Sequence, residues 1–263
     1  MANTKIASEN VWFTGAYGDR LSAALDWPEE GVDGEGGVRA WVLFSHGFSI
    51  GKNLKPIRTI SKTLVKAGFG MMRFDFTGLG DSEGDFSDTN FSSNVKDILG
   101  AAAYLRKHKS APAILIGHSF GGTAALMAAQ DIPECKALAT IGAPCDTGHI
   151  IHQFADQIKE IEMEGEAHVC LAGRPFVIKE QFLDDVTNQN MDKAIAALKV
   201  ALMVFHSPQD MVVGIDNASH IYNLARHPKS FVSLDGADHL LLKNAKDAAY
   251  VARVLSAWSQ RYI

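Results

Sequence analysis

Six short apolar runs recur along the 263-residue chain, and most of the intervals between them have helical spacing. Each run has the length of a strand that is buried on both faces of a sheet. Strands and helices that alternate in this way form a mainly parallel sheet covered by helices on both sides, so the sequence predicts an α/β fold. The predicted strands cover residues 40–46, 70–76, 113–119, 137–143, 201–207 and 230–236.

Two segments depart from this rhythm. Residues 11–28 alternate around turn-forming residues at 17–19, which predicts an N-terminal hairpin. Residues 146–199 are far longer than one strand-to-strand crossover needs, and they contain an alternating pattern around Gly173 that is typical of a second hairpin. We therefore expect one domain over residues 1–263, with a small inserted cap at about 146–199 that lies over the strand ends.

Charge and composition exclude several classes of partner. The formal net charge of -5 is spread along the chain, without the basic block that binding to nucleic acid or to an anionic membrane requires. The first residues lack the apolar stretch of a secretory signal, and no apolar run approaches membrane-spanning length, so a cytoplasmic location is expected. The three cysteines form no C-x-x-C pair, which favours free thiols, and we expect no metal or organic cofactor. The oligomeric state stays open.

Residues 117–121 read Gly-His-Ser-Phe-Gly, a G-x-S-x-G pattern between a strand-like run and a run of small residues with helical character. In a strand-to-helix turn this tight, the serine backbone is strained and the neighbouring positions must be almost free of side chains. Glycines at 117 and 121 meet that need, and the hydroxyl is left at the tip of the turn. The sequence therefore predicts Ser119 as a nucleophile.

A serine hydroxyl needs an imidazole to remove its proton and a carboxylate to orient that imidazole, and around this turn the partners follow in the order Ser, acid, His. Asp210 follows the penultimate predicted strand, and His239 follows the last one. Both loops open at the sheet edge that presents Ser119, so these two residues are the predicted acid and base. His46 and His118 flank the loop and the turn, where imidazole rings more often orient backbone.

The oxyanion of the tetrahedral intermediate needs backbone N–H donors. The residue after the nucleophile, Phe120, is predicted to supply one, and the loop after the first central strand, at residues 46–49, is predicted to supply the other from Phe48. The alternative is that this loop only ends a strand with a turn. Phe176 and Phe182 of the cap are the expected walls of a small apolar substrate pocket.

Residues 75–82 read Asp-Phe-Thr-Gly-Leu-Gly-Asp-Ser and contain a Gly-x-Gly pair. The dinucleotide pattern G-x-G-x-x-G is not completed, because Glu83 occupies its last position. A structural role that braces the floor of the site is therefore the preferred interpretation.

Together, the motifs H-G-F, D-F-x-G-x-G-x-S, G-H-S-F-G-G, S-P-Q-D and D-H resemble the α/β-hydrolase superfamily over nearly the whole chain. Segments such as residues 73–86, 90–98 and 227–241 resemble the hydrolase domain that precedes an OsmC-like domain in some bacterial proteins, and the present residues are expected to hold the hydrolase part alone. The cap is similar to that of feruloyl and cinnamoyl esterases.

The resemblance implies an α/β-hydrolase fold and serine-hydrolase chemistry at Ser119, Asp210 and His239, with Phe48 and Phe120 as oxyanion donors. A carboxylic-ester hydrolase acting on small or short-chain acyl or aryl esters is the expected function. Three alternatives remain open, namely a thioesterase, a peptidase and an accessory protein of an OsmC-like peroxide-defence system.

Overall fold

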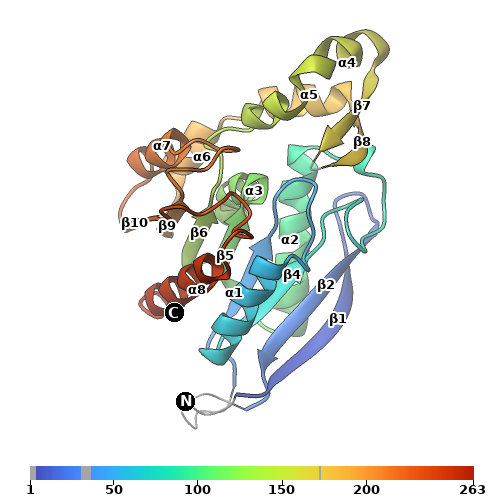
Figure 1. Cartoon of the computed structure of the whole chain (residues 1–263). Helices are drawn as coiled ribbons and strands as arrows, with labels where there is room; N and C mark the ends of the chain where they lie inside the picture. Colours follow the sequence, from blue (N-terminus) through green and yellow to red (C-terminus); the bar gives the residue numbers. More distant parts are fainter. Residues whose placement is uncertain (1–3, 31–36, 172) are drawn as a thin grey trace.

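The structure is a computed structural model that describes residues 4–30, 37–171 and 173–263 (Figure 1). Eight strands form the main sheet in the order β1-β2-β4-β3-β5-β6-β9-β10. All neighbours from β4 to β10 pair in parallel, whereas β1 and β2 add an antiparallel hairpin at one edge. The strands are β1 (Ile6–Thr14), β2 (Arg20–Pro28), β3 (Trp41–Ser45), β4 (Gly70–Phe74), β5 (Pro112–His118), β6 (Ala137–Ile141), β9 (Ala201–His206) and β10 (Lys229–Ser233).

This sheet confirms the α/β fold, the N-terminal hairpin and all six strands predicted from the apolar runs. Each of those six strands ends slightly earlier than predicted. Their last predicted residues are the first residues of loops, because the chain turns out of the sheet where polar residues such as Asp75 and Ser119 begin. Those early exits place the predicted site residues at the carboxyl edge of the sheet.

Two apolar layers cover the faces of the sheet. The helices α1 and α8 bury Ile60, Leu64 and Leu255 against one face, while α2 and α3 cover the other. Alternate strand residues supply both layers, since Leu43 of β3 joins one cluster and Phe44 the other. The helices of the body are α1 (Lys55–Lys66), η2 (Phe86–Asp88), α2 (Phe91–His108), α3 (Phe120–Ala128), η3 (Ala129–Asp131), α7 (Asp216–Leu224) and α8 (Ala245–Ser259).

Local sequence signals set where these helices begin. The Asn90 side chain accepts from the Ser93 N–H at the start of α2, and the Ser93 hydroxyl accepts from the Asn90 N–H, so the two form a reciprocal cap. Pro56 lies in the first turn of α1, where its missing N–H leaves no unmet hydrogen bond. The same helices that cover the sheet therefore start at positions fixed by their own residues.

Residues 146–199, which we call the cap, lie between β6 and β9. Their elements are η4 (Gly148–Gln157), α4 (Ile158–Glu164), β7 (Glu166–Leu171), β8 (Arg174–Lys179), α5 (Glu180–Thr187) and α6 (Met191–Ala197). β7 and β8 form a separate antiparallel hairpin, as the pattern around Gly173 predicts. Figure 1 shows α4, α5, β7 and β8 lying together beyond one end of the sheet, whereas α6 lies beside α7 and also contacts α3.

Within the described ranges, no helix combines the length and the apolar character that crossing a lipid bilayer demands.

Candidate active site

Ser119 lies at the turn between β5 and α3, where its backbone has the positive φ of 52°. Such a conformation is strained for a residue with a side chain, and the glycines around it explain how the turn is accommodated. A Cβ on Gly117 would lie 2.4 Å from Cα of Gly122, and one on Gly121 would lie 2.1 Å from the carbonyl oxygen of His46. The close packing of β5, α3 and the loop after β3 therefore depends on the glycines that the sequence motif specifies.

The structure brings the three predicted residues Ser119, His239 and Asp210 together. Nε2 of His239 lies 2.9 Å from Oγ of Ser119, and Nδ1 of the same ring lies 2.7 Å from Oδ2 of Asp210. A carboxylate only accepts hydrogen bonds, so Nδ1 of His239 carries the proton and Nε2 faces the serine hydroxyl as an acceptor. This tautomer is the one a general base requires.

The carboxylate of Asp210 is fixed from two sides. While Oδ2 contacts His239, Oδ1 accepts the backbone N–H groups of Val212 and Val213 at 2.8 and 3.0 Å. Burial acts to raise the pKa of Asp210, but the hydrogen bond and charge of His239 together with the two backbone N–H groups outweigh it and lower the pKa below its ordinary value. Asp210 is therefore ionised at neutral pH.

The loop after β3 lies directly against Ser119. A Cβ on Gly47 would lie 3.0 Å from Cβ of Ser119. The ring of His46 orients the peptide between Gly47 and Phe48, since its Nε2 accepts from the Phe76 N–H at 3.3 Å and its Nδ1 donates to the Gly47 carbonyl at 2.8 Å. In a trans peptide the N–H points opposite the carbonyl, so this contact sets the direction of the Phe48 N–H. Burial lowers the pKa of His46, which keeps the ring neutral.

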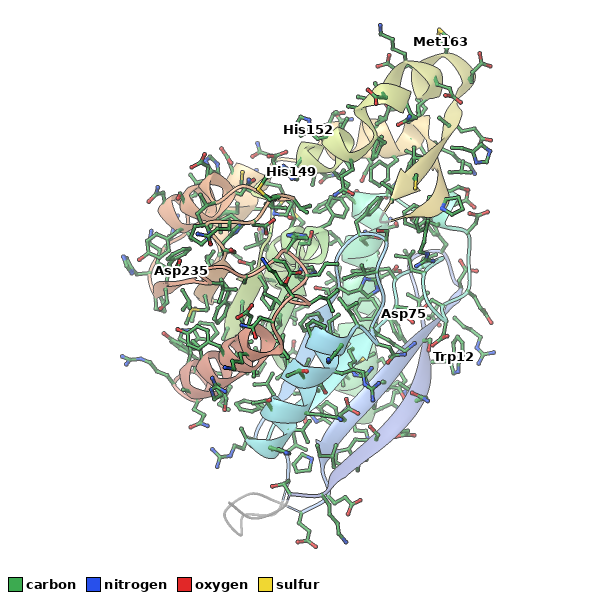
Figure 2. The ribbon with its side chains drawn as sticks, viewed as in Figure 1. Trp12, Asp75, His149, His152, Met163 and Asp235 are labelled. Carbon is green, nitrogen blue, oxygen red and sulfur yellow. The ribbon has the colours of Figure 1, made fainter. Side chains whose placement is uncertain are left out.

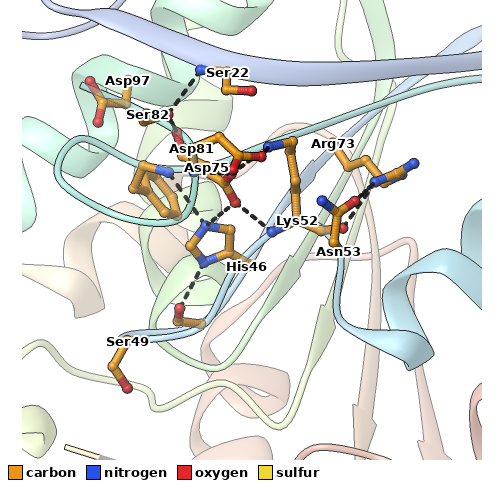
Figure 3. Close-up of polar contacts among 12 residues, drawn as sticks. Ser22, His46, Ser49, Lys52, Asn53, Arg73, Asp75, Asp81, Ser82 and Asp97 are labelled. Atoms are coloured by element: carbon orange, nitrogen blue, oxygen red, sulfur yellow. Dashed lines mark hydrogen bonds and ion pairs between the residues drawn. The ribbon is translucent and has the colours of Figure 1, made fainter. Parts of the chain in front are cut away.

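A buried ion pair between Lys52 and Asp75 lies next to His46 of this loop (Figure 3). Oδ1 of Asp75 accepts the backbone N–H of Lys52 at 2.6 Å, and Oδ2 contacts Nζ of Lys52 at 2.5 Å and the Asp81 N–H at 3.0 Å. A Cβ on Gly80 would lie 2.2 Å from Oδ2 of Asp75. The glycines of residues 75–82 thus let the chain wrap around a carboxylate, in agreement with the bracing role expected of this motif. Sequence reasoning missed Lys52, because a lysine in a loop is usually solvated.

A cleft of about 530 Å³ opens above Ser119. Its body side consists of residues 47–50, the Ser119 turn and the loops at 211–212 and 239–240, and its cap side consists of residues from η4 and β7. Among the described residues that line it, none is Asp, Glu, Lys or Arg. The exposed walls are therefore apolar side chains, histidines and small polar groups.

Phe176 and Phe182, the predicted pocket walls, lie elsewhere. Phe182 is 2% exposed and packs beneath Phe48, with ring centroids 5.7 Å apart. Phe176 packs on Phe86, with ring centroids 4.5 Å apart, and lines a separate depression between the β7–β8 hairpin and residues 84–87. These two residues do not reach the cleft, because the cap uses its large aromatic side chains to bury its own underside against the body.

Instead, the cap brings His149 and His152 to the cleft. Figure 2 shows both on η4, the first helical stretch of the cap. Nε2 of His149 lies 2.9 Å from the carbonyl oxygen of Val212, in the loop that carries Asp210. Sequence reasoning did not single out these two histidines, since no local pattern tells which side of a short helix faces a cleft. Within the described residues, no group of three potential metal ligands is present.

Comparison with known proteins places the chain in a family. Residues 36–171 match the model of the family described as serine aminopeptidase S33. The esterase domain of a Rhodothermus marinus protein is 44% identical in sequence, with a TM-score of 0.76 over 98% of this chain and 99% of that domain. Est1E from Butyrivibrio proteoclasticus, solved with ferulic acid bound, has a TM-score of 0.76 over 96% of this chain and 99% of its own, but at 20% identity it shows a common fold alone.

Among curated proteins, the mitochondrial palmitoyl-protein thioesterase ABHD10 of Rattus norvegicus is 33% identical over 134 residues. The match covers 49% of this chain and 44% of that protein, so the chain spans less than half the length of this relative. With the sheet order and the Ser119 turn described above, these matches show that the chain belongs to the α/β-hydrolase superfamily, in the serine aminopeptidase S33 family.

Proposed function

We propose that the protein is a serine esterase that hydrolyses small or short-chain acyl or aryl carboxylic esters through an acyl-enzyme. One observation carries this proposal: the hydroxyl of Ser119, the ring of His239 and the carboxylate of Asp210 form a continuous line of hydrogen bonds, 2.9 and 2.7 Å long. This arrangement activates a serine without any further group.

The proposed reaction begins when Oγ of Ser119 attacks the acyl carbonyl carbon while its proton passes to Nε2 of His239. The carbonyl oxygen becomes an oxyanion, which the backbone N–H groups of Phe48 and Phe120 stabilise. As the intermediate collapses, the proton moves from His239 to the leaving alkoxide, and the acyl group stays on Ser119. Water then attacks the acyl-enzyme, giving its proton to His239, and the acid leaves as Ser119 is restored.

The chemistry of the cleft favours an uncharged ester over a peptide with a free amino terminus. An aminopeptidase has to bind the ammonium group of its substrate, and a carboxylate at the cleft wall is the usual partner for a cation. None of the described lining residues carries a carboxylate. The family description therefore supports the hydrolase fold and nucleophile, while the lining residues favour an uncharged substrate over one with a free amino terminus.

The similarity to the rat thioesterase favours a second candidate, hydrolysis of acyl thioesters. The same three residues serve both reactions, but a thiolate is a better leaving group than an alkoxide and depends less on proton donation by His239. A pair of substrates with the same acyl group, one joined through oxygen and one through sulfur, separates the two functions by their ratio of kcat/KM.

The test measures hydrolysis of p-nitrophenyl esters of increasing acyl length, of the matched thioester and of an aminoacyl p-nitroanilide. The parent protein is compared with Ser119→Ala and with a control, Ser233→Ala, which removes an exposed hydroxyl of β10 outside the cleft. We expect turnover and fluorophosphonate labelling in the parent and the control, and neither in Ser119→Ala. Ester turnover equal in the parent and in Ser119→Ala would support an accessory role instead.

A further inference from the structure

We infer that His118 is a positioning residue for the catalytic base: its ring holds the backbone of His239 in place through a hydrogen bond to the His239 carbonyl oxygen. This inference rests on the proposed function, in which His239 is the general base. His118 is the last residue of β5 and directly precedes Ser119. Its Nε2 lies 2.8 Å from the carbonyl oxygen of His239, which is 121 residues away in sequence.

The ring of His118 is fixed both in protonation and in orientation. A carbonyl oxygen only accepts, so Nε2 of His118 carries the proton and Nδ1 is bare. Within the described structure Nδ1 is buried and has no hydrogen-bond partner. Burial, reinforced by the charge of His239, lowers the pKa of His118 to about 3, so the ring stays neutral and keeps its donor at neutral pH.

The His118 ring packs between the backbone at Gly47 and the ring of His239. A Cβ added to Gly47 would lie 3.0 Å from Nδ1 of His118. The ring centroids of His118 and His239 are 5.0 Å apart, so the two imidazoles lie side by side. The absence of a side chain at residue 47 therefore leaves space both for the His118 ring and for the Ser119 turn.

The consequence is that two consecutive residues hold the base. Ser119 meets the imidazole at Nε2, and His118 meets the backbone of the same residue at its carbonyl oxygen. The other hydrogen bonds of this loop are local, such as the Leu241 N–H to the Asp238 carbonyl, or run to the loop after β9, where Gln209 accepts the Gly236 N–H and Asp210 meets the His239 ring. The contact from His118 thus ties residue 239 to the end of β5, which is the same rigid strand that carries the nucleophile. A displacement of about 1 Å at a reacting group costs on the order of 10²-fold in rate.

The experiment compares His118→Leu, which fills similar space without a donor, with His118→Gln, whose side-chain amide places an N–H near the position of Nε2. We expect His118→Leu to lower kcat by about 10- to 100-fold with little change in KM, and His118→Gln to recover most of that loss. Should His118→Leu fail to fold, His118→Asn replaces it, because its shorter amide does not reach the carbonyl oxygen. Thr123→Val is the matched control, since it removes another buried side-chain bond to a backbone carbonyl, that of Pro144, away from residue 239.

A second readout does not depend on turnover. The Nδ1–H of His239 donates to Asp210, and we expect it to give a far-downfield proton NMR resonance. This resonance should shift or broaden in His118→Leu and stay in place in His118→Gln and Thr123→Val. Leu and Gln variants with the same kcat and the same resonance would overturn the inference. Absence of Ser119-dependent turnover in the parent would overturn the proposed function, while the NMR comparison would still decide whether His118 positions His239.

Discussion

His239 and Asp210 are joined through one carboxylate oxygen only: Nδ1 of His239 meets Oδ2 of Asp210 at 2.7 Å, while Oδ1 is held by two backbone N–H groups. The backbone N–H groups therefore orient the Asp210 carboxylate independently of its hydrogen bond to His239. Because the two residues come from loops after β9 and β10, the relationship also locks those two loops together.

Replacing Asp210 by Asn tests the role of this carboxylate. The amide cannot accept at both of its ends, so His239 loses the tautomer that leaves Nε2 free to take the serine proton. We expect kcat to fall by about 10³- to 10⁴-fold with KM nearly unchanged. Asp235→Asn, at an exposed carboxylate that accepts from Ser233, is the control and should retain the parent rate in the same ester assay. A loss of less than tenfold in Asp210→Asn would argue against its assignment.

Gly121→Ala tests the packing of the Ser119 turn. The added Cβ would lie 2.1 Å from the carbonyl oxygen of His46, and a backbone atom has little freedom to retreat. We expect the free energy of unfolding to fall by roughly 3 kcal/mol, measured by urea denaturation. Gly214→Ala, where the added Cβ meets nothing within 4 Å, should change it by no more than about 0.5 kcal/mol. Equal effects of the two substitutions would mean that steric crowding does not select the glycine at 121.

Lys52→Met tests the buried ion pair between Lys52 and Asp75. The side chains of Lys52 and Asp75 are 3% and 2% exposed, so removal of the lysine leaves an uncompensated carboxylate in the interior. Breaking such a pair from one side destabilises a protein by about 3–5 kcal/mol, and we expect a loss of that size in urea denaturation. Lys179→Met breaks the exposed pair with Asp88 and should leave the denaturation midpoint close to that of the parent. Similar midpoints for the two variants would contradict a stabilising role for the buried pair.

The low pKa of His118 makes stability depend on pH. The histidine titrates near 6.5 in an unfolded chain and at about 3 in the folded protein. Between these values the unfolded chain binds a proton that the folded protein excludes, so stability falls as pH drops below about 6.5, by roughly 1.4 kcal/mol per pH unit for one full proton.

The comparison that isolates this effect is urea denaturation of the parent and His118→Gln at several values between about pH 7 and pH 4. Glutamine binds no proton, so the variant should lose stability less steeply on acidification. The buried rings of His46 and His206, whose pKa values burial also lowers, remain in both proteins and give them a common background slope. Parallel curves over this range would show that His118 does not exclude a proton in the folded state.

Much of the fold follows from local pattern. The apolar runs at β3 and β5 are long enough for buried strands and too short for helices, so their order along the chain predicts the sheet. The turn at Ser119 is also a local property, because only glycines at 117 and 121 admit such a close approach of backbone. The order of Ser119, Asp210 and His239 follows from the parallel sheet, whose carboxyl ends meet at one edge.

Contacts between remote segments could not be predicted in this way. Lys52 is buried because the loop at 75–82 folds over it, and His149 reaches the cleft because the cap turns that side of η4 inward. Phe182 was expected in the cleft but lies under Phe48, since a large apolar ring gains more by leaving water than by facing it.

The sequence by itself determined the strands, the strained turn and the identity of a serine, an acid and a histidine able to work together, because periodicity and backbone sterics act over a few residues. Only the tertiary structure decided which residues line the cleft, the burial of Lys52 and the hydrogen bond from His118 to the backbone of His239. Those features depend on which side chains meet when segments 23 to 121 residues apart pack together, and no short stretch of sequence contains that information.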